Sequence, residues 1–206
     1  MKHLTPTLGL LSITAAASAQ LVPVVKPHGI GTEYFSVGAT YSHLSGWGPA
    51  GGANSTTIDA RASIDRNFFL TAAYTGMSAI DSTTDPSSWA LGFGAKHEAG
   101  NGAFEFSYAY RQVDIGAVSH NQNIVKVGYS LDLGRGLDFG LAVMEVFNES
   151  AAGGNVTAPV ASVSYKFAQG LSANVSYSTE NTVYGLKSYG GADAGKTLSF
   201  GVRYSF

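Results

Sequence analysis

The sequence predicts an all-β fold, a closed antiparallel up-and-down β-barrel of about ten strands that spans a membrane. Apolar and polar residues alternate with period 2 along most of the chain, as they do in strands with one apolar face. Charged residues make up only 13% of the 206 residues, about half the share of an ordinary soluble domain. No segment after the N-terminal region approaches the roughly 18 consecutive apolar residues of a membrane helix, so a membrane would be crossed by strands.

Ten segments carry the alternation. In the first, 32–44, Phe35, Val37 and Tyr41 share one face while Ser36 and Thr40 share the other. The same division recurs in 58–64, 68–75, 89–96, 104–111, 125–132, 137–143, 161–167, 171–177 and 198–206. The pattern is weakest in 156–167 and 171–180, and the barrel has eight strands if those two form a loop excursion.

The connections alternate in length. Those at 65–67, 98–102, 133–136 and 168–170 are short, and an even number of strands places both termini at this end of the barrel. Long connections rich in Gly, Ser, Asn and Asp are expected at 45–55, 78–87, 114–122, 148–157 and 181–196. Long loops are therefore expected at one end of the barrel, and short turns at the other.

The polar face decides which side of the sheet meets lipid, because soluble and membrane barrels share the period of 2. A soluble barrel would turn many Lys and Glu residues toward water, whereas this face is mostly Ser, Gly, Ala and Thr. The opposite face is rich in Phe, Tyr and Leu, with aromatics near segment ends, as in interfacial girdles. We expect the apolar face to meet lipid; the alternative is a secreted β-barrel or sandwich.

The N-terminus reads as an export signal. Residues 1–19 combine Lys2, an apolar stretch from Leu8 to Ala17 and the small-residue site Ala17-Ser18-Ala19, which is typical of a cleaved secretory signal peptide. Residues 20–31, with Pro23 and Pro27, are expected to form a periplasmic flank. The barrel domain is then 32–206.

The C-terminal residues SFGVRYSF resemble the assembly signal of bacterial outer-membrane β-barrel proteins, a superfamily that includes small porins. The resemblance lies in Ser199, Gly201, Tyr204 and the terminal Phe206. It implies an outer-membrane location in a double-membraned bacterium. It also implies the barrel assembly machinery, periplasmic chaperones and outer-membrane lipids as partners. We expect a monomer.

A nearly balanced set of charges is predicted to line the lumen. Lys96 and Glu105 should pair across the hairpin around 98–102. The set forms either a constriction that selects ions or an internal salt-bridge and hydrogen-bond network that fills the lumen, and ten strands favour a filled or very narrow lumen. Its members are Asp59, Arg61, Lys96, Glu105, Arg111, Lys126, Asp132, Asp138, Lys166 and Arg203.

Several classes of function are excluded. The net charge of −2, without a Lys/Arg cluster, argues against nucleic-acid binding. Five scattered His residues and no Cys give no metal site, and we expect no cofactor. GGADAGKT, residues 190–197, matches a phosphate-loop pattern, but it leads into a strand rather than the helix that such a loop requires.

Three functional hypotheses remain. The first is a non-catalytic scaffold with a structural or surface-interaction role for its long extracellular loops. The second is a narrow passive pore for ions or small solutes. The third is a rim-located enzyme, because His43, Asp81 and Ser82 faintly resemble the His and Asp-Ser of the outer-membrane lipid A palmitoyltransferase, whose amphipathic N-terminal helix has no counterpart here. We expect no enzymatic activity.

Overall fold

The computed structural model describes residues 35–45, 52–79, 86–149, 154–185, 188–189, 192–193 and 195–206. The predicted signal peptide and periplasmic flank lie outside these residues. In the part of the chain that is described, there is no helix long and apolar enough to cross a membrane.

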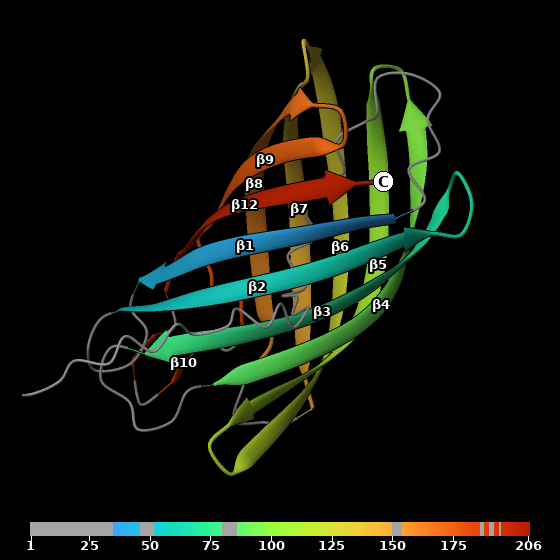
Figure 1. Cartoon of the computed structure of the whole chain (residues 1–206). Coiled ribbons are helices and arrows are strands. Elements are labelled where there is room, and N and C mark those ends of the chain that lie inside the picture. The colour runs from blue at the N-terminus through green and yellow to red at the C-terminus, as the bar shows by residue number, and fades with distance from the viewer. Residues whose placement is uncertain are drawn as a thin grey trace, which may run out of the picture.

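Ten strands form a closed barrel, as predicted (Figure 1). Neighbouring strands are antiparallel and consecutive around the barrel, which closes where β1 pairs with the last strand, from Ser36 opposite Ser205 to Leu44 opposite Thr197. The alternative of eight strands is wrong, because β8 and β9 pair along the same sheet. The barrel strands are β1 (Phe35–Ser45), β2 (Gly52–Ser63), β3 (Phe68–Ala79), β4 (Ser87–Ala99), β5 (Gly102–Ile115), β6 (Val118–Gly134), β7 (Leu137–Asn148), β8 (Val156–Ala168), β9 (Leu171–Ser178) and β12 (Thr197–Ser205).

The apolar face points outward and the polar face points into the lumen. Phe68, Leu91 and Phe200 are at least half exposed on the outer surface, whereas Thr75 and Ser199 are completely buried. This is the arrangement of a transmembrane barrel, in which lipid covers the apolar face.

Tight turns close the end that we call the short-turn end: 64–67, 100–101, 135–136 and 169–170. At the β6–β7 turn, Arg135 and Gly136 both have positive φ, 55° and 80°. Two successive turn residues with positive φ match the right-handed twist of the flanking strands, and glycine adopts positive φ without a steric clash.

The opposite end, which we call the long-loop end, differs from the prediction at 114–122. These residues form no long loop: β5 continues to Ile115, and β6 resumes at Val118 after a two-residue turn. Beyond Tyr110 the outward positions become polar, as at Gln112 and Asp114, while the inward Val113 is completely buried. The alternation thus continues, but with polar residues outward and apolar residues inward, as in a sheet whose outer face meets water. This hairpin therefore extends beyond the lipid.

The connection from β9 to β12 is the longest at this end and contains a small two-stranded sheet of β10 (Ser188–Tyr189) and β11 (Ala192–Asp193). Other expected loops are shorter than predicted because their flanking strands are longer: β1 ends at Ser45 and β2 begins at Gly52.

Candidate functional site: the barrel lumen

The long-loop end of the lumen is apolar, although the sequence predicts a polar lining. Inward positions there carry apolar side chains that pack together, as in the core of a soluble protein. One cluster comprises Leu44, Ala53, Met77, Val113, Val183 and Tyr184, and the other Ala109, Ile124, Met144, Val146, Val156 and Ala158.

Two residues of the first cluster come from the β9–β12 connection. Residues 181–185, here called the inserted segment, are completely or almost completely buried. Asn181 organises them, because its Oδ1 accepts the backbone N–H groups of Val183 and Tyr184, both at 3.1 Å. The backbone N–H of Gly185 donates to the Asn181 carbonyl at 3.2 Å. A compact turn of the chain thus fills the long-loop end.

Arg111 of β5 holds the inserted segment. Its Nη1 donates to the carbonyl oxygens of Val183 at 2.5 Å and Thr182 at 3.3 Å, and its Nε donates to Gln122 Oε1 at 2.6 Å. The side chain is 0% exposed. Gly185 leaves room for it, since a Cβ there would lie 2.5 Å from Arg111 Nη2. Arg111 therefore lies in the lumen, as expected, and in the part of the chain described it clamps a loop through hydrogen bonds rather than through an ion pair.

Two further wall residues complete this clamp. Gln122 Nε2 donates to the Tyr184 carbonyl at 2.7 Å, and Asn148 Nδ2 donates to the Gly185 carbonyl at 3.0 Å. The Tyr184 hydroxyl donates to the Pro86 carbonyl at 3.2 Å. Four consecutive backbone carbonyls, 182–185, are thus bound by side chains of β5, β6 and β7, which satisfies polar groups that would be costly to bury alone.

Closer to the short-turn end, charged residues meet across the lumen. Arg61 Nη1 of β2 pairs with Glu105 Oε2 of β5 at 2.9 Å. Lys96 and Glu105 lie opposite each other in the β4–β5 register, as predicted. The expected ion pair between them does not form, because Glu105 pairs with Arg61, and Lys96 Nζ instead contacts Glu98 at 3.5 Å. Arg61 reaches Glu105 with its guanidinium stacked on the Phe69 ring, 3.3 Å from the ring centroid.

A second ion pair joins the closing strand to β2. Arg203 pairs with Asp59, and its Nη1 also donates to Ser36 Oγ at 2.8 Å. Gly38 lies between them on β1, where a Cβ would meet Asp59 Oδ1 at 2.5 Å and Arg203 Nη2 at 3.0 Å. The missing side chain is what lets this pair form across β1.

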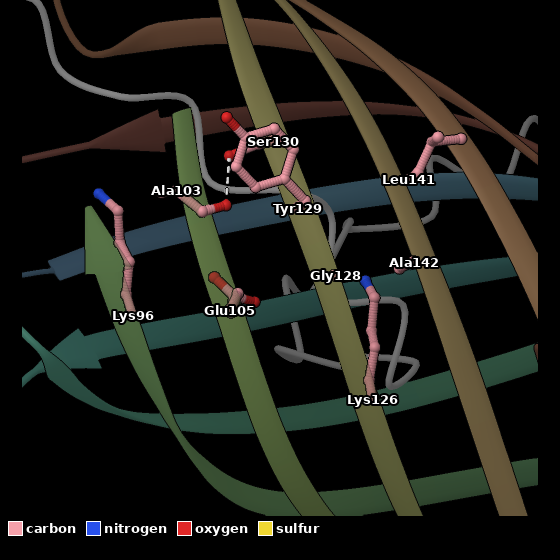
Figure 2. A pocket seen from close by; sticks show the side chains of 9 residues that line it. All are labelled: Lys96, Ala103, Glu105, Lys126, Gly128, Tyr129, Ser130, Leu141 and Ala142. Atoms are coloured by element: carbon pink, nitrogen blue, oxygen red, sulfur yellow. Dashed lines mark hydrogen bonds between the residues drawn. The ribbon is translucent and has the colours of Figure 1, made fainter. Parts of the chain in front are cut away.

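Lys126 of β6 lies beside the Arg61–Glu105 pair, only 6% exposed, and lines a cavity of about 20 Å³ (Figure 2). Lys96 and Glu105 line the same cavity, and Gly128 and Ala142 keep it open because they contribute almost no side chain. Figure 2 shows Lys96 and Lys126 on either side of Glu105, with their amino groups extending in the same direction.

The remaining predicted charges lie beside the short turns. Asp132 and Asp138 face each other in the β6–β7 register, and Asp132 Oδ1 accepts the Gly134 backbone N–H at 2.7 Å. Asp138 is 4% exposed, and both it and Lys166 make further interactions. These residues stabilise the turn end of the barrel.

The predicted assembly-signal residues divide between the two faces of β12. Ser199 faces the lumen, where its Oγ lies 2.7 Å from Ser42 Oγ, and Gly201 leaves room for Asn174 and Thr40. Tyr204 and Phe206 point outward, with their ring centroids 4.8 Å apart, and the Phe206 ring is 5.9 Å from that of Phe35. This arrangement leaves their role in assembly a prediction.

Comparison with known proteins decides the family. The family model described as Gram-negative porin matches residues 2–151, more than half of the chain. The chain belongs to the Gram-negative porin family. As a porin-family barrel it resides in the bacterial outer membrane, with its short turns on the periplasmic side.

Solved structures similar to this porin-family protein are also outer-membrane barrels, and no curated protein matches it. A loop-deletion mutant of the Vibrio cholerae outer membrane protein OmpT is 14% identical, with TM-score 0.39, over 83% of this chain and 62% of that one. The chain thus spans less than two thirds of OmpT. The KdgM porin in complex with disordered oligogalacturonate is 11% identical, with TM-score 0.48, over 82% and 99%. The beta domain of the Bordetella autotransporter BrkA is 13% identical, with TM-score 0.47, over 84% and 99%.

The residues of the enzyme hypothesis are not brought together by the described structure. His43 is exposed on the outer face, where its Nδ1 lies 2.9 Å from Asn54 Oδ1. Asp81 and Ser82 lie outside the described residues. The resemblance to the lipid A palmitoyltransferase therefore gains no geometric support.

Sequence reasoning missed the clamp residues Gln122 and Asn148 and the whole inserted segment. One signal was available: the pair Val183-Tyr184 interrupts a polar connection, and inward positions near the loops turn apolar, as at Met77 and Met144. Apolar residues on both the loop and the facing wall indicate that the loop is buried.

Proposed function

We propose that this porin-family protein is a non-catalytic outer-membrane scaffold with a closed lumen, which presents its extracellular connections to partners at the cell surface. The observation that carries the proposal is the inserted segment, since Val183 and Tyr184 are 0% exposed within the extracellular end. A loop packed this way supports a barrel that does not conduct steadily.

The rest of the lumen supports the same proposal. Inward-facing Thr57, Thr75 and Ser107 are at most 2% exposed, so water has almost no access to them. The Arg61–Glu105 and Arg203–Asp59 pairs then cross the periplasmic half. Ten strands enclose little space, and these groups fill most of it.

The scaffold presents a rigid element to the exterior. The β5–β6 hairpin rises above the last outward aromatic residue, Tyr110, and its tip is tied by Ser119 Oγ donating to Asp114 Oδ1 at 2.5 Å. Binding residues commonly sit on connections that a rigid barrel positions. Proposed partners are surface ligands for these connections, outer-membrane lipids around the barrel, and the assembly machinery and periplasmic chaperones during export. The barrel is proposed to act as a monomer.

Single-channel recording tests the closed lumen. Protein refolded in detergent should migrate faster unheated than boiled, which shows that the barrel is intact, and the same sample in planar bilayers should give no steady current. A discrete, steady conductance from heat-modifiable wild-type protein would contradict the proposal.

The second candidate is a narrow passive pore, which membership of the porin family favours. In that case a conductance should be present, and its ion selectivity should change in Arg61→Gln or Lys126→Gln, because both cations face the lumen. Conductance that both substitutions leave unaltered would count against a pore through this lumen.

A further inference from the structure

Lys126 is a buried cation that lacks a bound carboxylate among the described residues. It is 6% exposed, and the carboxylate nearest to it in the network, Glu105, forms its ion pair with Arg61 at 2.9 Å. Burying an ammonium group without a counter-charge is expensive, so lysines buried this deeply are normally paired.

The charges around the cavity do not balance. Arg61, Lys96 and Lys126 contribute three positive charges, against Glu105 and Glu98. The Glu98 side chain is 62% exposed, so water screens it, whereas Glu105 is 13% exposed. At least one positive charge inside the barrel wall is left without a counter-charge.

The cavity has the right size for a single small ion. Its volume of about 20 Å³ exceeds the minimum that one water molecule needs. Gly128 follows Lys126 on the same face of β6, and Lys126, Gly128 and Ala142 line the same cavity (Figure 2). The small residues thus leave space next to the amino group.

We propose that this cavity is a binding site for one small monovalent anion, which in a physiological medium is chloride. The Lys126 ammonium donates to the ion, and Lys96, on the other side of Glu105, adds positive potential. Glu105 restricts the site to a single negative charge, because a multivalent anion would be repelled by its carboxylate. The site is independent of whether the lumen conducts, since it needs access only from the periplasmic end.

Thermal unfolding in detergent tests the site. Wild-type protein is heated at pH 7 in sodium chloride, bromide or gluconate at equal ionic strength, and the loss of the fast-migrating form is followed. Gluconate is too large for the cavity. An ion that binds only the folded state stabilises it, so the midpoint should be about 2–4 °C higher in chloride and bromide than in gluconate. Equal midpoints in the three salts would overturn the proposal.

Variants assign the effect to this cavity. Lys126→Met keeps an unbranched side chain as far as Cε but removes the charged amino group, and it should abolish the difference between chloride and gluconate. Lys166→Met is the matched control, because Lys166 is another lumen-end lysine that does not line the cavity, and it should keep the difference. A difference retained in Lys126→Met would overturn the proposal.

A direct measurement covers the case in which Lys126→Met does not fold. Wild-type crystals grown in sodium bromide should show an anomalous peak between the Lys126 amino group and Gly128. No peak there in well-ordered wild-type crystals would overturn the assignment.

Discussion

Arg111 has a single structural task, to hold the inserted segment against the wall through the carbonyls of Thr182 and Val183. Arg111→Met should leave these carbonyls and Gln122 Oε1 without their donor, at a cost of about 1–3 kcal/mol for each buried group. We expect the connection to become sensitive to limited proteolysis near 181–185 while the barrel stays heat-modifiable. Arg66→Met, on an exposed turn, is the control. Equal protection of the segment in wild type and Arg111→Met would show that Arg111 is not the clamp.

Asp114 gives a pH-dependent prediction at the same scale. Hydrogen bonds from Ser119 and Gln112 stabilise its carboxylate and lower its pKa below the usual 3.8. A depressed pKa means that the stabilisation of the hairpin tip is present above pH 3.8 and is lost as the pH falls through the lower, folded-state pKa. Titration followed by NMR should show this pKa, and Ser119→Ala should raise it. An unchanged pKa in Ser119→Ala would contradict the role of the hydroxyl.

At the scale of elements, the strands were predictable and their extramembrane extensions were not. Alternation located all ten barrel strands because lipid outside and polar groups inside impose one sense of the pattern. The ends of β5 and β6 were not predicted. Above the lipid, the apolar Val113 faces inward and the polar Asp114 faces outward, so apolar and polar residues still alternate but have exchanged faces. The Gly, Ser, Asn and Asp residues of 114–122 led to the prediction of a long loop there.

The candidate site shows the same limit. The sequence placed Arg61, Glu105 and Lys126 in the lumen correctly, since the face of a residue follows from its position in the strand. It could not give their partners, because the Arg61–Glu105 pair joins β2 to β5 across the lumen rather than along a hairpin. The inserted segment depends on contacts between residues 71 and 72 positions apart, as between Arg111 and the carbonyls of 182 and 183, which no local pattern encodes.

At the scale of the whole molecule, closure of the barrel depends on one long-range strand pair, β1 with β12. The chain ends on the outer surface of this seam, where the Phe206 backbone N–H donates to the Phe35 carbonyl at 2.9 Å. The Phe206 side chain is 67% exposed, and its ring contacts those of Tyr204 and Phe35. Lipid accounts for this exposure as it does for the other outward aromatics, so recognition of the ring during insertion has to be tested against a matched outward aromatic residue.

Phe206→Asp should therefore reduce the amount of heat-modifiable, membrane-inserted protein in cells, while purified protein still refolds in detergent. Phe167→Asp is the matched control: Phe167 is also an outward aromatic at the short-turn end, 51% exposed, but it belongs to β8. A charge at either position costs similar interfacial energy, about 0–1 kcal/mol near the membrane surface, so lipid contact alone predicts equal effects. A much larger loss of insertion for Phe206→Asp would support recognition of the terminal strand. Equal losses of inserted protein in the two variants would show that Phe206 acts only as an interfacial aromatic residue, and would contradict an assembly signal at this position.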